Sequence, residues 1–168
     1  MKGLIARNSL IKQVIAQIEQ RLRAGVREPY QKIVVAGEKY AANGDDKSLL
    51  AQLKDSEDVV KDCVEGAIGL VGVLRRAAKG AMPGDAMALA AFTLTLEALD
   101  FAERIGKIQI DKAVIDEVTQ RFVDTLLPRL GLTPQKLGEM ASRVQGVMAD
   151  PDRMAKLHGT GKTQPGAR

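Results

Sequence analysis

Residues that usually build catalytic and metal sites are scarce in this chain. Its 168 residues include one Cys, one His and no Trp, and aromatic residues make up 3% of the total. Without a histidine pair, the di-iron sites of helical bundles are excluded. The lone His158 is far from Cys63 in the sequence, so nothing places a base beside that thiol. We therefore expect a protein that is not an enzyme and has no cofactor or metal.

Disulfides and long hydrophobic runs are also missing. One cysteine cannot form an intramolecular disulfide, which fits a reducing compartment. Cys63 lies in the apolar stretch 59–64, where a free thiol packs as a small buried hydrophobe. No stretch approaches the roughly 18 apolar residues of a membrane span, and charges at Lys2 and Arg7 precede any long apolar run. We therefore expect no signal peptide and a chain made in a cytosol.

Helical patterns fill most of the sequence. Apolar residues recur every three or four positions along the first pattern, at Leu10, Ile11, Val14, Ile15, Ile18 and Leu22, which predicts one amphipathic helix. No segment sustains the alternation of a strand. The predicted fold is all-α, a compact bundle of about six to eight helices joined by short connections, which favour antiparallel neighbours.

Capping residues, Gly and Pro place the helix ends. The first helix should begin after Asn8 or Ser9 and end before Gly25. The second should open at Pro29, a residue tolerated at the first helical position. Further helices are expected over residues 48–53, 57–79, 84–105, 112–129, 134–148 and 151–157. This organisation predicts one helical domain over residues 1–157 and a disordered basic tail over residues 158–168.

Small residues mark the centre of the chain. Gly66, Gly69 and Gly72 fall near one helix face, although each glycine in a helix interior costs about 0.5–1 kcal/mol relative to Ala. Close approach of the next helix, rich in Ala from Ala86 to Ala91, would offset that cost. We therefore expect a central Gly/Ala-rich helical hairpin. The alternative is a hairpin that opens to insert into a partner or a membrane surface.

Three acids recur on the second helix of this hairpin. Glu97, Asp100 and Glu103 are spaced three residues apart, and Glu65 of the preceding helix could face them. Because no His accompanies them, a metal site is not expected. We interpret these acids as a solvated face or as ion-pair partners of Arg75, Arg76 and Arg104.

Positive charge is concentrated at the two ends of the chain. Residues 1–32 hold seven Lys and Arg against two Glu, a net +5, and residues 153–168 add +4. The residues between them therefore carry about −5. The candidate interaction surface combines cations near the ends of the first and fourth helices: Arg21, Arg23, Arg27, Arg75, Arg76 and Lys79. It would contact an acidic partner, DNA or an anionic surface; the alternative is ordinary solubility charge.

Three segments carry a resemblance to a known class of protein. The run 53–66, LKDSEDVVKDCVEG, together with residues 98–102, ALDFA, and 130–134, LGLTP, is similar to small virion-associated proteins of tailed bacteriophages. The resemblance would cover about residues 5–155. It implies a structural component of the particle, internal, ejected or associated with the head–tail region, that is made in the bacterial cytoplasm. It implies no active-site residues.

Three functional hypotheses remain open at this point. A particle component would be present in several copies and would self-associate or bind other virion proteins, through an apolar helix face such as that of residues 10–22. A cytoplasmic adaptor or regulatory module would bind one protein partner. A weak, non-specific nucleic-acid binder would use the basic ends and show steep salt dependence. The chain has no helix rich in Arg, Asn and Gln of the kind that reads base edges.

Overall fold

The computed structural model describes residues 6–41 and 49–129, and these residues form helices and connections without a strand. The six described helices are α1 (Ser9–Arg21), α2 (Ala24–Ala41), α3 (Leu49–Lys54), α4 (Val59–Ala77), α5 (Gly84–Arg104) and α6 (Lys112–Arg129). The all-α bundle expected from the sequence is confirmed. The chain divides into two units, residues 1–126 and 127–168. Of the second unit, the structure describes only residues 127–129 at the end of α6. The description of the fold therefore concerns the first unit.

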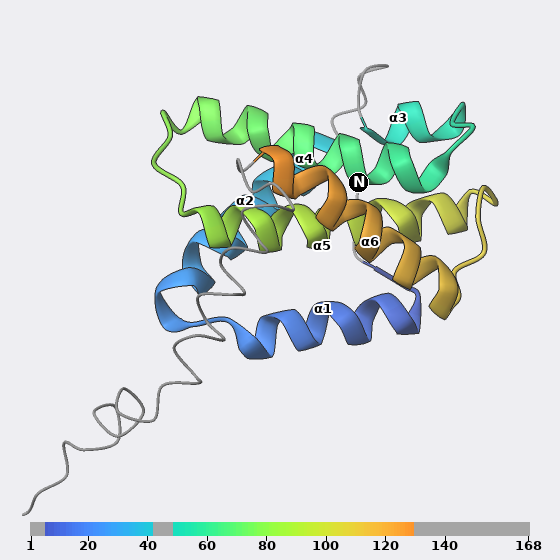
Figure 1. Ribbon diagram of the computed structural model, residues 1–168, viewed down its shortest axis with the longest axis horizontal. Helices are drawn as coiled ribbons and strands as arrows, with labels where there is room; N and C mark the ends of the chain where they lie inside the picture. The colour runs from blue at the N-terminus through green and yellow to red at the C-terminus, as the bar shows by residue number, and fades with distance from the viewer. Residues whose placement is uncertain (1–5, 42–48, 130–168) are drawn as a thin grey trace, which may run out of the picture. The chain divides into compact units, whose positions relative to one another are not determined.

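Helix α5 is the centre of the bundle. It packs most extensively against α4, then against α2, and also contacts α1 and α3 (Figure 1). The expected hairpin of α4 and α5 is therefore present. Ala86, Ala90 and Ala98 of α5 have no exposed surface, and the small side chains let neighbouring helices approach this helix closely. Burial of apolar side chains around α5 supplies the main driving force for the fold.

The glycines of the hairpin do not have the role that their spacing predicted. Gly69 is exposed, and a Cβ built on Gly69 or Gly72 meets no atom within 4 Å. A Cβ on Gly66 would overlap the Leu49 side chain, which belongs to α3 rather than to α5. The close approach to α5 is instead made by α2, where a Cβ on Gly37 would lie 2.5 Å from Leu94 Cδ1. The prediction of a three-glycine contact with α5 is wrong.

Helix α2 begins earlier than its proline predicted. Arg23 O accepts hydrogen bonds from Val26 N and Arg27 N, so the first turn forms before Pro29. Gly25 therefore lies inside α2 instead of ending α1, and Pro29 sits in the sixth position of the helix. Inside a helix, Pro removes one N–H donor. Tertiary contacts offset this loss, because Tyr30 is almost fully buried and its hydroxyl lies 2.9 Å from Thr93 Oγ1 of α5.

Side-chain caps fix three helix starts. Asn8 Oδ1 accepts from Leu10 N at 2.9 Å at the start of α1, and Asp111 Oδ1 accepts from Val114 N at 2.9 Å at the start of α6. Asp58 caps α4 by accepting from Lys61 N at 3.1 Å. Each oxygen satisfies an amide that has no partner within its helix. The Asn8 cap follows the sequence prediction, and Asp111 directly precedes the helix predicted over residues 112–129. The helices expected over residues 134–148 and 151–157, and the tail over 158–168, lie outside the described residues.

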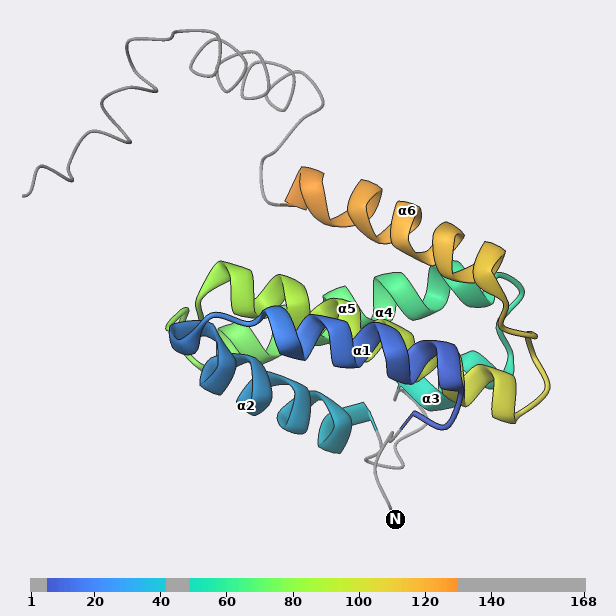
Figure 2. The same ribbon diagram turned by 90° about the horizontal axis from the view of Figure 1, so that it is seen from below.

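The apolar face of α1 is turned toward its own bundle. Ile11 has no exposed surface, and Val14, Ile15 and Ile18 pack partly buried against the core. The main neighbour of α1 is α5, and Figure 2 shows α1 lying along the bundle. This face is therefore occupied by the chain's own core. Self-association through it would require α1 to leave the bundle.

Candidate interaction surface

The six cations predicted to form an interaction surface lie at one end of the bundle. Arg21, Arg23 and Arg27 surround the junction between α1 and α2, and Arg75, Arg76 and Lys79 surround the end of α4. Both views show the α1–α2 junction and the α4–α5 connection at the same end (Figures 1 and 2). A surface pocket of about 350 Å³ lies between residues 28–33 of α2 and residues 81–83 of the α4–α5 connection. We call these six residues the basic end.

The cations of the basic end have few partners of their own. All six are exposed, and none forms an ion pair with another residue that the structure describes. Arg27 Nη2 donates to Glu19 O at 2.9 Å, which draws α2 toward the end of α1. Lys79 has φ of 52°, in the left-handed region, and Gly80 follows at 79°. This turn ends α4 and leaves Arg75, Arg76 and Lys79 in solvent, near helix carbonyls that favour positive charge.

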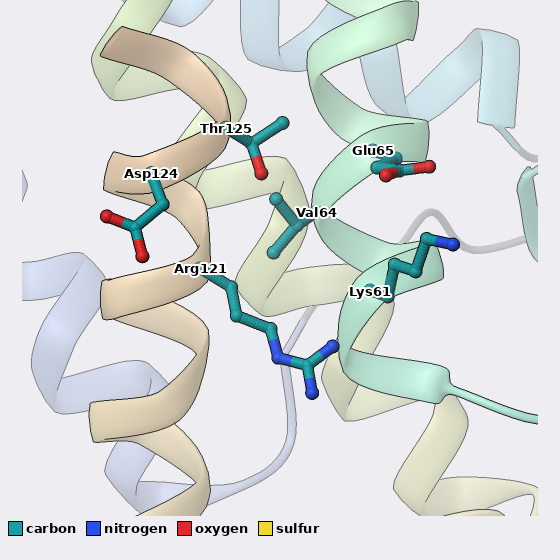
Figure 3. Close-up of a pocket in the computed structure, with 6 residues that line it drawn as sticks. All are labelled: Lys61, Val64, Glu65, Arg121, Asp124 and Thr125. Carbon is teal, nitrogen blue, oxygen red and sulfur yellow. The ribbon is translucent and has the colours of Figure 1, made fainter. Parts of the chain in front are cut away.

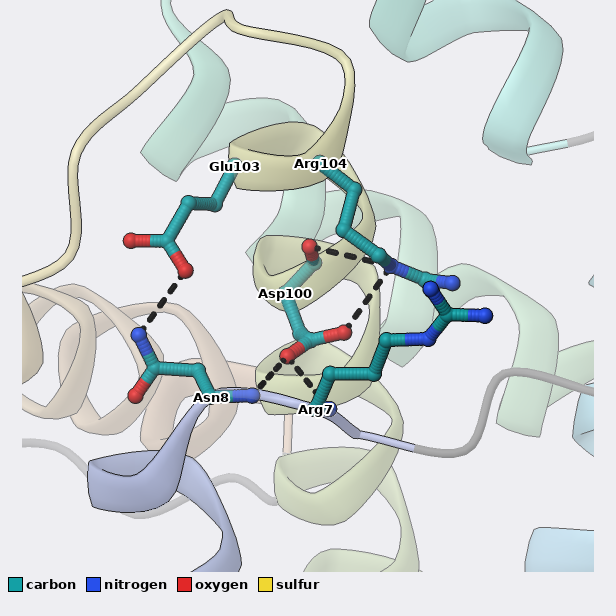
Figure 4. Close-up of polar contacts among 5 residues, drawn as sticks. All are labelled: Arg7, Asn8, Asp100, Glu103 and Arg104. Carbon is teal, nitrogen blue, oxygen red and sulfur yellow. Dashed lines mark hydrogen bonds and ion pairs between the residues drawn. The ribbon is translucent and has the colours of Figure 1, made fainter.

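Asp100 of α5 is buried, so the solvated face that was one alternative of the sequence interpretation is wrong for this residue. It is 1% exposed. Its Oδ1 accepts hydrogen bonds from Arg7 N at 2.7 Å and Asn8 N at 2.6 Å (Figure 4). Its Oδ2 lies 3.1 Å from Arg104 Nε in an ion pair, out of line for a hydrogen bond. The predicted pairing of an acid with Arg104 is therefore correct, but the carboxylate also binds the segment before α1.

Glu103 completes this connection. Its Oε2 accepts from Asn8 Nδ2 at 2.8 Å, and its Oε1 accepts from Ile110 N at 2.8 Å. One carboxylate therefore joins the start of α1 to the connection between α5 and α6. Together with Asp100 it fixes where α1 begins, so these two acids have a positioning role within the bundle.

Glu97 is also buried, which the prediction of a solvated face missed. It is 6% exposed, and its Oε2 has no hydrogen-bond partner among the described residues. Burial, together with the charge and side-chain hydrogen bond of Glu38, raises the pKa of Glu97 to about 9. Glu97 therefore holds a proton at neutral pH. The sequence signal that was available is the unbroken run of apolar and small residues on both sides of Glu97.

Glu65 does not face the acids of α5. It is exposed on α4 and lies on the rim of a surface pocket of about 230 Å³ between α4 and α6 (Figure 3). Arg121 reaches into this region from α6, but its guanidinium is already paired. Its Nη1 lies 2.7 Å from Asp58 Oδ2 and its Nη2 lies 2.9 Å from Glu117 Oε1. The guanidinium of Arg121 is therefore engaged, and the other cation of the lining, Lys61, is an exposed lysine of α4.

Cys63 is the buried thiol that the sequence predicted. It has no exposed surface, and burial raises the pKa of its thiol to about 12. A thiol with so high a pKa is a poor nucleophile at neutral pH. Within residues 6–41 and 49–129, no group of three or more His, Cys, Asp and Glu side chains is arranged to hold a metal ion. No helix in that part of the chain is long and apolar enough to span a membrane.

Comparisons of the chain with protein-family models, curated proteins and solved structures found no match. The functional argument therefore rests on the chain's own residues.

Proposed function

We propose that this chain is a non-enzymatic interaction protein whose basic end docks on an acidic surface of a protein partner. The observation that supports the proposal is the gathering of six exposed cations, none paired with an acid of the described residues, from two separate parts of the sequence at one end of the bundle. Exposed cations without ion pairs create a positive potential that steers an acidic partner and adds to its affinity. The bundle itself serves as a rigid scaffold that holds the two groups of cations together.

The setting we propose is the particle of a tailed bacteriophage. The resemblance to small virion-associated proteins supports this setting, in which the chain is made in the bacterial cytoplasm and then packaged with other virion proteins. The alternative is a cytoplasmic adaptor that binds one protein partner through the same basic end. The two settings differ in copy number, since a particle component assembles in several copies.

The test of the docking surface uses a fluorescent deca-glutamate peptide as the acidic probe. We expect binding at low salt that weakens as salt is added, because exposed charges are screened. Replacing Arg75, Arg76 and Lys79 together by Gln should weaken binding about tenfold, at roughly 0.5 kcal/mol per exposed charge. The matched control replaces three exposed lysines away from this end, Lys39, Lys61 and Lys107, by Gln. Equal binding by the two triple variants would contradict the proposal.

A duplex DNA of random sequence distinguishes the nucleic-acid hypothesis. A DNA-binding surface would bind the duplex more tightly than the peptide, with a steep logarithmic dependence on salt.

Light scattering after size exclusion, at low and high salt, distinguishes the phage-particle component from the cytoplasmic adaptor. A defined oligomer that persists in high salt favours the particle component. A monomer at every concentration, without any co-purifying particle protein, favours the adaptor.

A further inference from the structure

The pocket between α2 and the α4–α5 connection gives the basic end an apolar feature. It has a volume of about 350 Å³ and opens to solvent. Most of its lining is apolar and comes from both walls, and two members are charged: Pro29, Ile33, Ala81, Met82 and Pro83, with Glu28 and Lys32. An apolar surface that faces water gains free energy when another apolar group covers it. The pocket therefore suits a group that the six cations alone would not recognise.

The fold holds both walls of this pocket in place. On α2, Ile33 is 2% exposed and belongs to the core. On the other wall, Gly80 N donates to Arg75 O at 3.0 Å, and Met87 N donates to Pro83 O at 3.0 Å. Both ends of the α4–α5 connection are therefore bonded to the residues of a helix or its cap. A pocket with ordered walls costs little conformational entropy to fill.

Positive charge predominates beside the pocket. Arg27 directly precedes its α2 wall, and Lys79 stands two residues before its other wall. Within the lining, Lys32 Nζ lies 2.7 Å from Glu28 Oε1, so this acid is already compensated by its own lysine. Asp85, two residues beyond the pocket, adds one further acid. A ligand that complements this region therefore carries negative charge beside an apolar group.

We propose that this pocket receives a branched aliphatic side chain, Leu or Ile, from an acidic segment of the protein partner, whose acids contact the cations of the basic end. The inference rests on the proposed docking of the basic end and adds what the partner carries there. A side chain that fills a pocket at the centre of a charged surface is a common anchor of protein interfaces. The phosphate backbone of a nucleic acid offers negative charge without such a side chain, so the apolar lining favours a protein.

The two parts of this surface should respond differently to salt. Added salt screens the exposed cations and weakens their attraction for acids. Burial of an aliphatic side chain does not depend on charge. The preference of the pocket for an aliphatic side chain should therefore persist at salt concentrations that weaken binding as a whole.

The experiment compares two fluorescent peptides with the same glutamates on both sides of a central residue, which is Leu in one and Gly in the other. The full chain should bind the Leu peptide about tenfold more tightly, because half-burying a leucine side chain is worth about that factor. Added salt should weaken both peptides and leave the ratio of their affinities unchanged. Backbone amide shifts of Ile33 and Met82 should be larger with the Leu peptide, which locates the contact.

Ala81→Phe tests the pocket directly. Ala81 is exposed on the pocket wall, so the larger side chain takes up the space without disturbing the core. We expect this variant to bind the two peptides equally, with the affinity of the parent for the Gly peptide. The matched control Ala113→Phe makes the same change at an exposed position of α6 and should keep the preference of about tenfold. If Ala81→Phe does not fold, Ala81→Gln replaces it, and the polar wall should reduce the preference.

The outcomes separate this inference from the proposed function. Equal binding of the two peptides by the parent would overturn the pocket and leave the basic end standing, provided that the triple Gln variant of Arg75, Arg76 and Lys79 still weakens both. A Leu preference that survives in Ala81→Phe would place the apolar contact elsewhere and also overturn the inference. Binding of neither peptide would overturn both proposals. Tighter binding of the random duplex DNA than of the Leu peptide would assign the basic end to a nucleic acid and leave the pocket without this role.

Discussion

At the scale of single residues, Asp100 connects segments far apart in the sequence. Its Oδ1 accepts from two backbone amides, and its side chain is 1% exposed. Asp100→Ala would leave both amides without their acceptor, and we expect it to lower the free energy of unfolding by about 2–4 kcal/mol. Urea unfolding measures the change. Asp116→Asn, at an exposed ion pair with Lys112, is the control and should stay within about 0.5 kcal/mol of the parent.

Glu97 should make stability depend on pH. Its pKa is about 9 in the folded chain and near 4.5 when unfolded, so the folded state binds more protons between these values. Stability is therefore greatest at the acid end of this range and falls as pH rises, by at most about 1.4 kcal/mol per pH unit. Glu97→Gln removes this dependence and should become more stable than the parent as pH rises. Parallel urea curves of the two proteins across this range would contradict the assignment.

The burial of the acids of α5 could not be predicted from the sequence, for a physical reason. A spacing of three residues places Glu97, Asp100 and Glu103 along one side of a helix, but it does not say what covers that side. Here the segment before α1 supplies amide donors to Asp100, and α2 brings Glu38 against Glu97. Both partners are distant in sequence. The pairing of Asp100 with Arg104 is local, which is why spacing predicted it.

At the scale of helices, two glycines form a matched pair of tests. A Cβ on Gly37 would lie 2.5 Å from Leu94 Cδ1, and Leu94 is 1% exposed, so shifting its side chain would disturb the packing of the core. Gly37→Ala should therefore destabilise the protein by about 1–3 kcal/mol. Gly69 is exposed with open space around it, so Gly69→Ala should stabilise α4 by about 0.5–1 kcal/mol. Thermal unfolding distinguishes them, and a shift in the same direction for both would be inconsistent with this packing.

Helix starts were predictable where a local side chain decides them. Asn8 and Asp111 cap α1 and α6 within the first turn, so the residue type and its place before an apolar pattern were sufficient. The start of α2 could not be predicted from local residues. Burial of Tyr30 and its contact with Thr93 favour a helix that continues through Pro29. Gly66 shows the same limit: its near neighbour is Leu49 of α3, a short helix that the sequence predicted without indicating which helix it packs against.

At the scale of the whole molecule, the helices should differ in how readily they open. Helix α5 contacts each of the other described helices, whereas α1 depends mainly on α5 and on the hydrogen bonds of Asp100. Local opening costs least where few contacts break. We expect the backbone amides of α5 to exchange with solvent slowest and those of α1 to exchange first among the long helices. Hydrogen exchange by mass spectrometry measures the order, and equal protection of α1 and α5 would contradict it.

The buried thiol of Cys63 turns such opening into a chemical signal. Because it is the only cysteine in the chain and has no exposed surface, a thiol reagent in excess labels the protein no faster than α4 leaves its neighbours. The labelling rate therefore measures how often the core around Cys63 opens to solvent. A labelling rate equal to the rate of global unfolding would mean that the α4–α5 hairpin stays closed in the native state. A faster labelling rate would mean that this hairpin opens while the rest of the bundle remains folded.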